Sequence, residues 1–360
     1  MKTDVLQFLI LLVSGLFSVV TGFILDLAIT NQSFKSIEGL VALIPALMGL
    51  KGNLEITMAS RMSTLFNIRY DSVSWKEVTI EIVNDMVLVQ SQATVVSIIA
   101  AIYIIVTKGL WHTNKIITIC TLSILTSNST CLGLGLLISL IIIATKNFGH
   151  DPDDFSGPVA SSMGDLVTVL VIICFAFLLK ITHKVDELPI EAITAVFFFL
   201  ILEPILLYLS FKNSTTRHIL LYGWTPIIVS MIISETSGLL LEKASHKYKS
   251  FILFQPLFNG FIGNCVAIQA SRIATSLHRM GDIGTVSHDF DVCVSPYYVF
   301  CSKKNVNSRT TCVLIVSAIP CKILFILLIT ITDFMGTSLL ILLYYLLGIL
   351  GDINAVPIVL

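Results

Sequence analysis

Long apolar segments alternate with short polar gaps along the whole chain. Nearly all of these segments are long enough to cross about 30 Å of hydrocarbon as an α-helix, a form that satisfies every backbone N–H and C=O group within the segment itself. The strand-like alternation that a membrane barrel needs is absent. The pattern therefore predicts an all-α polytopic membrane protein with ten spans, at about 5–29, 39–65, 85–107, 116–145, 158–180, 190–211, 218–242, 252–277, 310–331 and 333–350.

Composition and charge agree with this prediction. Of the 360 residues, 55% are hydrophobic and 12% are charged, whereas soluble domains carry about 25% charged residues. The net charge of −1 excludes a basic protein that binds nucleic acid. The sequence has no P-loop, no Gly-x-Ser-x-Gly, no His-Glu-x-x-His and no Cys-x-x-Cys motif. We therefore expect neither an enzyme nor a bound cofactor.

An internal repeat is the most informative feature of the sequence. Residues 45–53 and 59–64 align without gaps onto residues 256–264 and 270–275, at one constant offset. The identical positions are Pro, Gly, Gly, Asn, Ala, Ser, Arg and Thr. These residues are mostly small or polar, so a shared apolar composition cannot produce the match. Internal repeats are typical of transporters whose substrate site lies between the two halves.

The positions of the repeated motif predict how the halves are oriented. The motif lies on the second and the eighth predicted spans, and two even-numbered spans cross the membrane in the same direction, so the repeats are parallel. A half of five spans then needs one extra crossing before the next half begins. We expect residues 1–182 to form the first repeat, 183–217 to hold a peripheral connector helix, and 218–360 to form a second repeat of four spans. The fifth span of that second repeat is missing from this plan.

The repeated motifs resemble those of a known family. Residues 45–55 and 255–264 resemble the paired motifs of the solute carrier 41 family, the eukaryotic relatives of the bacterial MgtE magnesium channel. Residues 151–154 and 164–166 resemble the signature of that family's fifth span. The resemblance covers about residues 35–357. It implies a transporter of divalent cations, above all Mg²⁺, with two MgtE-like repeats that form a single-chain pseudo-dimer around a pore. It also implies a location in the lipid bilayer of the plasma membrane.

Asp165 is the foremost candidate for a cation ligand. It lies about two turns into the apolar run that begins at Pro158. A carboxylate is costly in hydrocarbon and should face a cavity or pore, and magnesium prefers hard oxygen ligands. The resemblance assigns a pore-lining, cation-binding Asp to this position. The alternative is a carboxylate that only bonds a neighbouring helix.

The repeated motif supplies further candidates for the ion path. The amide oxygens of Asn53 and Asn264 offer contacts to an ion or its water. A proline in each motif can kink or break its helix, and the glycines allow close helix packing or free a carbonyl. The alternative is helix packing alone. These helix-break positions are Pro45, Gly49, Gly52, Pro256, Gly260 and Gly263.

Glu55 is a candidate metal ligand on the first motif only, because its repeat equivalent is Val266. A lone Glu within a span is a functional candidate, although it can instead pair with Lys51 one turn away. For the equivalent Arg61 and Arg272 we favour snorkelling to the interface. Asp151, Asp153 and Asp154 either attract cations or cap the following helix.

Two function classes remain open from the sequence. The first is transport of divalent cations between the pseudo-symmetric repeats. The second is a non-transporting structural or regulatory membrane protein derived from the same family, which the missing span makes plausible. Because the repeat partner of Asp165 would lie on that span, we expect the chain to hold a dication more weakly than a site with two acids.

Overall fold

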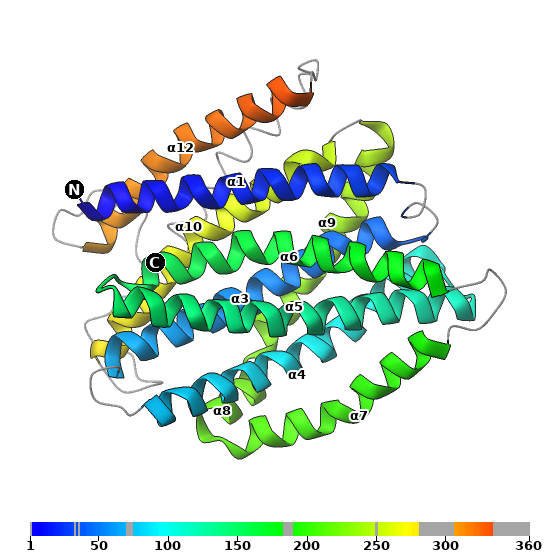
Figure 1. The fold of residues 1–360 in the computed structure, drawn as a ribbon, viewed down its shortest axis with the longest axis horizontal. Coiled ribbons are helices and arrows are strands. Elements are labelled where there is room, and N and C mark those ends of the chain that lie inside the picture. Colours follow the sequence, from blue (N-terminus) through cyan, green and yellow to red (C-terminus); the bar gives the residue numbers. More distant parts are fainter. Residues whose placement is uncertain are drawn as a thin grey trace.

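The structure is a computed structural model that describes residues 2–31, 34, 37–69, 75–182, 190–248, 251–280 and 306–333. Across this part of the chain the regular secondary structure is entirely helical (Figure 1). The helices are α1 (Lys2–Thr30), α3 (Leu40–Arg69), α4 (Trp75–Lys108), α5 (Thr113–Asn147), α6 (Pro152–Thr182), α7 (Ile190–Lys212), α8 (Ser214–Tyr222), α9 (Trp224–Lys247), α10 (Phe251–Met280) and α12 (Val306–Asp333).

Nine of the described helices are long and apolar enough to cross a membrane, which leaves only the short α8 outside this class. They correspond in order to the first nine spans predicted from the sequence, so the prediction of a multi-pass helical membrane protein is confirmed for this part of the chain. The tenth predicted span, 333–350, lies outside the described residues apart from its first residue. The long polar loop between α10 and α12 also lies mostly outside them.

Helices α3 and α6 form the middle of the bundle together with α10. Helix α1 packs along α10 and α6, and α9 packs along α3. Helices α4 and α5 cover α3 and α6 on the other side, and α12 lies along α1 (Figure 1). The repeated motifs on α3 and α10 are therefore in direct contact at the centre of the molecule.

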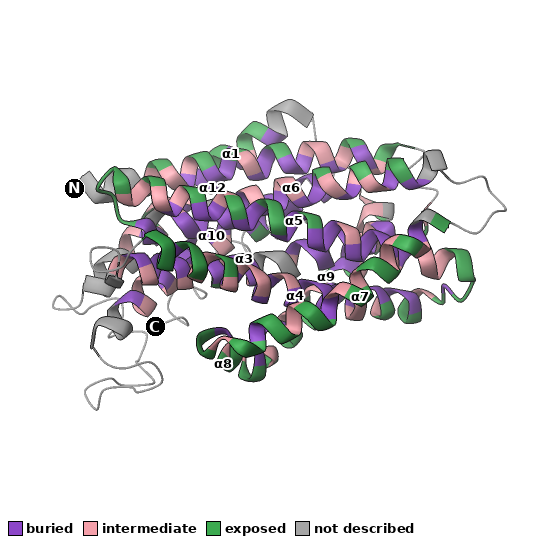
Figure 2. Cartoon of the chain, turned by 60° about the horizontal axis from the view of Figure 1, so that its bottom comes forward, coloured by how far each residue is buried: buried purple, intermediate pink, exposed green. Residues whose placement is uncertain are grey.

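Helix α7 lies at the margin of the bundle, where it packs on α4 and α5 and is followed by α8 (Figure 2). Most of its side chains point outward, and Ile201 is 69% exposed. This agrees with the predicted peripheral position of the segment 190–211. The many outward-facing apolar side chains on α1, α5 and α12 are also as expected for helices that face lipid.

Local sequence signals explain several helix ends. Gly149 has a φ of 73°, a left-handed conformation that glycine adopts without the steric cost of a Cβ. Its N–H bonds the carbonyl of Lys146, and the next N–H bonds the carbonyl of Thr145, so α5 is closed by a glycine cap. Asn213 caps α8, since its side-chain oxygen accepts from the N–H of Thr215 at 2.9 Å.

Candidate functional site

Asp165 lies on α6 at membrane depth and is buried, with only 3% of its surface exposed. Its Oδ2 has no hydrogen-bond partner among the described residues. That oxygen faces α10, because a Cβ added to Gly260 would lie 3.4 Å from it. The same position on Gly260 would lie 2.6 Å from Ser18 Oγ on α1. The carboxylate therefore points into the junction of α1, α6 and α10.

Glu55 brings a second carboxylate to this junction from α3. It is fully buried, and its Oε2 would lie 2.5 Å from a Cβ added to Gly164. Gly164 directly precedes Asp165, and the carboxylates of Glu55 and Asp165 are close enough to interact electrostatically. The absence of a side chain at residue 164 is what admits the Glu55 carboxylate here. The side chain of Lys51, the alternative partner of Glu55, lies outside the described part of the structure.

The two motif asparagines differ in their contacts. Asn264 on α10 is fully buried and lies one turn beyond Gly260. Its Nδ2 donates to Ser14 Oγ on α1 at 2.8 Å, and its Oδ1 has no partner among the described residues. Asn53 on α3 instead donates to the carbonyl of Gly49 on its own helix, at 2.9 Å. Asn264 thus has an amide oxygen without a partner among the described residues at the contact of α10 with α1, whereas Asn53 is partly exposed and bonded to its own helix.

The motif prolines were expected to kink or break their helices, and neither helix is broken at its proline. Helix α3 continues through Pro45 and α10 through Pro256, each at the sixth residue of the helix. A proline lacks the N–H that would bond the carbonyl four residues earlier, but the later turns of each helix continue regularly. Close packing by neighbouring helices on both sides holds these turns in place.

The motif glycines allow unusually close helix contacts. A Cβ added to Gly49 would lie 2.0 Å from Ser234 Oγ on α9, just as Gly260 meets Ser18 on α1. Gly263 meets Ser161 of α6, with 2.9 Å from an added Cβ to the hydroxyl oxygen. The absence of a side chain at Gly49, Gly260 and Gly263 therefore allows neighbouring helices to pack closely. The surroundings of Gly52 lie outside the described side chains.

Two further glycines, upstream of the motifs, approach backbone carbonyls. A Cβ added to Gly22 on α1 would lie 2.1 Å from the carbonyl oxygen of Leu253 on α10. A Cβ added to Gly238 on α9 would lie 2.3 Å from the carbonyl oxygen of Ala42 on α3. Leu253 and Ala42 each lie three residues before the motif proline of their helix. Contacts of this kind between a glycine Cα–H and a carbonyl recur at helix–helix interfaces.

Asp153, near the start of α6, forms a polar cluster at the end of α3 and α10. Its Oδ2 accepts hydrogen bonds from Thr275 Oγ1 at 2.7 Å and from Asn67 Nδ2 at 3.0 Å, and its Oδ1 accepts one from Ser63 Oγ. Burial raises the pKa of Asp153 to about 6, and the nearby Asp151 acts in the same direction, while the three hydrogen bonds oppose the shift.

Asp151 caps the start of α6, which was one of the two alternatives considered for it. Its Oδ1 accepts from the backbone N–H of Asp153 at 3.0 Å, as a cap at the start of α6 does. The same oxygen accepts from Asn67 Nδ2 at 2.9 Å. The acidic segment before α6 therefore caps that helix and also ties it to the end of α3.

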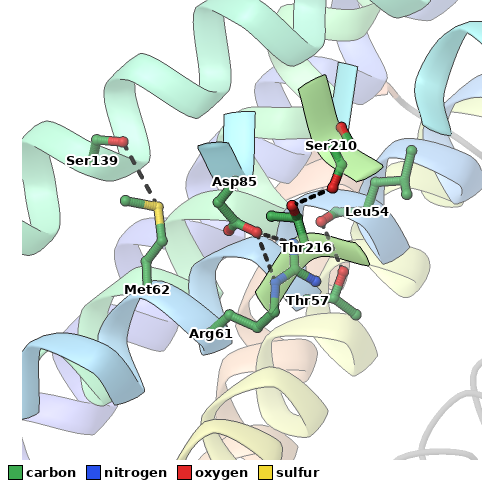
Figure 3. Close-up of polar contacts among 8 residues, drawn as sticks. All are labelled: Leu54, Thr57, Arg61, Met62, Asp85, Ser139, Ser210 and Thr216. Carbon is green, nitrogen blue, oxygen red and sulfur yellow. Dashed lines mark hydrogen bonds and ion pairs between the residues drawn. The ribbon is translucent and has the colours of Figure 1, made fainter. Parts of the chain in front are cut away.

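The expectation that Arg61 snorkels to the interface is wrong. Arg61 pairs instead with Asp85 on α4 (Figure 3). Its Nε donates to Asp85 Oδ1 at 2.9 Å, and its terminal nitrogen lies 2.8 Å from the same oxygen. Both side chains are mostly buried. Figure 3 also shows Met62, one residue further along α3. Its sulfur accepts a hydrogen bond from the hydroxyl of Ser139 on α5 at 3.8 Å. These contacts fix α3 against α4 and α5.

Several polar residues near the site could not be chosen from the sequence alone. Ser14 and Ser18 of α1 meet Asn264 and Gly260, and Ser161 of α6 meets Gly263. A signal did exist, because Ser14 and Ser18 have counterparts in Ser230 and Ser234 at the same offset that relates Gly22 to Gly238. Gln269 on α10 is fully buried, and neither of its polar side-chain atoms has a partner among the described residues.

The arrangement is not that of a resident metal centre. Within the described side chains, no group of three or more His, Cys, Asp and Glu residues lies close enough to hold a metal ion. Two neighbouring carboxylates suit a transient contact with a hydrated dication, since Mg²⁺ keeps several of its waters and needs few protein ligands.

Comparison with known proteins places the chain in a family. The MgtE family, described as "Divalent cation transporter", matches residues 44–175, which run from α3 into α6. Solute carrier family 41 member 3 of Mus musculus is 35% identical over 327 residues, which are 88% of this chain and 66% of the relative. The member 3 protein of Rattus norvegicus is 33% identical over 350 residues, 94% of this chain and 75% of the relative.

Solute carrier family 41 member 2 of Homo sapiens is 34% identical over 326 residues, which are 88% of this chain but 55% of the relative. The chain therefore spans between about half and three quarters of the length of these relatives. No solved structure matches the chain.

The similarity extends over nearly the whole chain and includes the helices that carry the repeated motifs. It confirms the resemblance inferred from those motifs. It also confirms that the chain is related to transporters and not to enzymes. This multi-pass membrane protein belongs to the solute carrier 41 family.

Proposed function

We propose that the chain transports divalent cations, and Mg²⁺ in particular, along a path between two pseudo-symmetric halves. In this proposal Asp165 is the principal ligand in the path, and Glu55, Asn264 and Asn53 line it. The motif positions Pro45, Gly49, Gly52, Pro256, Gly260 and Gly263 shape the helices around it.

The carboxylate of Asp165 carries this proposal. It is 3% exposed at membrane depth, and one of its oxygens has no partner among the described residues. An Asp at the centre of a membrane helix costs about 2.5–3.5 kcal/mol on translocon scales. A carboxylate that only held two helices together would be expected to use both oxygens. An unpartnered oxygen at the junction of both halves is what an intermittently bound cation requires.

Paired contacts support the relation between the halves. Gly22 meets the Leu253 carbonyl as Gly238 meets the Ala42 carbonyl. In the same way Ser18 meets Gly260 as Ser234 meets Gly49. In both pairs, the first helix of one half touches the second helix of the other. This reciprocal pattern is expected for two repeats related by a pseudo-two-fold axis.

One contact supports the parallel orientation of the repeats. Thr64 Oγ1 and Thr275 Oγ1 are 3.3 Å apart, and each threonine lies near the last turns of a 30-residue helix. Their contact brings the final turns of α3 and α10 to one end of the bundle. Parallel repeats with an axis along the membrane normal predict such a contact. In this proposal the chain makes a pseudo-dimer by itself, with residues 1–182 and 218–360 as its halves and 183–217 as the connector. The proposed location is the plasma membrane.

The chemistry of the junction favours Mg²⁺. Its oxygen donors are carboxylates from α3 and α6 and the free amide oxygen of Asn264. Hard oxygen ligands suit Mg²⁺, Ca²⁺ and Mn²⁺, whereas softer metals such as Zn²⁺ and Cu²⁺ prefer nitrogen and sulfur. Two carboxylates can hold a hydrated ion through its waters, and partial hydration keeps the binding weak enough for release.

The direct test is Mg²⁺ uptake into liposomes that contain the protein and a Mg²⁺-sensitive dye. We expect Asp165→Asn to abolish uptake. The matched control is Glu203→Gln, which neutralises another carboxylate of a membrane helix, one that is 8% exposed on the peripheral α7. Uptake that persists in Asp165→Asn would contradict the proposed site.

Ion binding gives a second readout that does not depend on flux. A ligand that binds only the folded state raises its stability by RT ln(1 + [L]/Kd). We expect Mg²⁺ to raise the melting temperature of the wild type and of Glu203→Gln, but not that of Asp165→Asn. A folded protein that shows neither uptake nor a Mg²⁺-dependent shift would instead favour the structural or regulatory alternative.

A further inference from the structure

The Asp153 carboxylate joins three helices at one end of the bundle. It lies on α6 and accepts from Ser63 and Asn67 of α3 and from Thr275 of α10. Asp153 is 1% exposed and the hydroxyls of Ser63 and Thr275 are buried with it. The carboxylate is thus a polar tie between the motif helices of the two halves.

The tie lies where α3 and α10 meet. Thr64 contacts Thr275 at 3.3 Å, and Ser63 Oγ lies 3.4 Å from Ser271 Oγ. All four residues are buried. Nearer the middle of the bundle lie Asp165 and Asn264 on the same two elements, α6 and α10. An ion that moves from Asp165 toward this end along the α3–α10 interface must therefore pass the buried hydroxyl contacts.

We propose that Asp153 is a gate residue, whose carboxylate closes the path by tying α3 to α10 until its hydrogen bonds to Ser63 and Thr275 break. This inference rests on the proposed transport function but adds an element that the transport site does not contain. A gate built from hydrogen bonds to one carboxylate suits this role. Each bond to a charged group is strong enough to hold the closed state, yet water can replace it on opening.

The opening can be measured at Thr64, which lies in the contact but does not bond Asp153. In Thr64→Cys, the buried thiol should react slowly with a small hydrophilic methanethiosulfonate reagent. Modification of residue 64 is followed by mass spectrometry of the peptide that contains it, so the native cysteines do not interfere. Adding Thr275→Val removes one hydroxyl from the tie, and we expect labelling to accelerate about tenfold, which corresponds to about 1.4 kcal/mol.

Matched variants separate the gate from a general loosening of the protein. Thr275→Ser keeps the hydroxyl and should leave the labelling rate within about twofold of the parent. Thr130→Val removes a fully buried hydroxyl that bonds only its own helix, α5, and should also leave it unchanged. Ser63→Ala removes the second hydroxyl of the tie and should accelerate labelling as Thr275→Val does. Equal labelling rates in all of these variants would overturn the gate.

A flux measurement then tests whether the gate lies on the ion path. We expect the adduct at residue 64 to block Mg²⁺ uptake into liposomes, and a reductant that removes the adduct to restore it. Undiminished uptake by fully labelled protein would refute the gate while leaving the transport proposal intact. A wild type that never transports Mg²⁺ would refute the transport proposal, and the labelling rates would still decide whether Asp153 holds the two helices together.

Discussion

Thr64 and Thr275 are 211 positions apart in the sequence, yet their hydroxyl oxygens lie 3.3 Å apart. This separation is the same as that between the motif prolines, Pro45 and Pro256. A residue that touches its own repeat equivalent lies on or beside the axis that would relate the repeats. The contact therefore supplies a reference point for locating the interface between the proposed halves.

The close approach of α1 to α10 and of α9 to α3 predicts that Gly22 and Gly238 tolerate no side chain. In Gly22→Ala and Gly238→Ala, the new Cβ would lie 2.1 and 2.3 Å from a carbonyl oxygen, so the helices must move apart. We expect each variant to lose about 1–3 kcal/mol of unfolding free energy, as overpacked sites do. Unfolding in detergent measures the loss.

The control for this prediction is Gly133→Ala on α5. A Cβ there meets nothing within 4 Å, and alanine is the better helix former by up to about 1 kcal/mol. Gly133→Ala should therefore leave the stability unchanged or raise it slightly. If it destabilises the protein as much as Gly22→Ala, the close contacts are not the cause.

Asp165 should lower the stability of the ion-free protein. Its carboxylate is buried at membrane depth, with one oxygen unpartnered in the described structure. We expect Asp165→Asn to raise the unfolding free energy in Mg²⁺-free buffer by about 1–3 kcal/mol while uptake is lost. Unfolding with and without Mg²⁺ is the measurement. A large loss of stability would indicate that Asp165 has a structural role instead.

The buried pair of Arg61 and Asp85 should be strongly coupled. Removing one member of such a pair leaves the other charge uncompensated, which costs about 3–5 kcal/mol. We expect Arg61→Ala and Asp85→Ala each to destabilise the protein in this range. The double variant should lose clearly less than the two losses added together. Additive losses would show that the ion pair contributes little.

The pH dependence of the unfolding free energy should reveal the titration of the Asp153 carboxyl group. Burial raises the pKa of Asp153 from its ordinary value of 3.8 to about 6, so between these pH values the folded state binds a proton that the unfolded state releases. The unfolding free energy should then fall as pH rises from about 4 to 6, by about 3 kcal/mol in total.

Replacing the titrating group isolates this contribution. Asp153→Asn cannot ionise, and we expect this part of the pH dependence to disappear from its unfolding curve. Asp151→Asn changes the neighbouring acid at the exposed start of α6 and should keep most of the slope. A slope that persists in Asp153→Asn would assign the titration to another group.

The sequence by itself determined the helical architecture and the family. Hydrophobic segments of membrane length leave the backbone no alternative to helices, so their number and order could be predicted for all nine described spans. The sequence also singled out Asp165 as a candidate ligand, because a carboxylate in an apolar run stands out from its surroundings. The parity of the spans predicted that both motif helices run in the same direction, which the Thr64–Thr275 contact supports.

Only the tertiary structure decided which side chains meet. The sequence could not tell that Arg61 pairs with Asp85, since their charges say nothing about which helix lies beside which. It could not predict that α3 and α10 continue through their prolines, because tight packing by neighbouring helices holds the turn in place. The hydrogen bonds of Asp153 were also hidden, because their three donors come from helices far apart in the chain, and close packing alone brings them to one carboxylate.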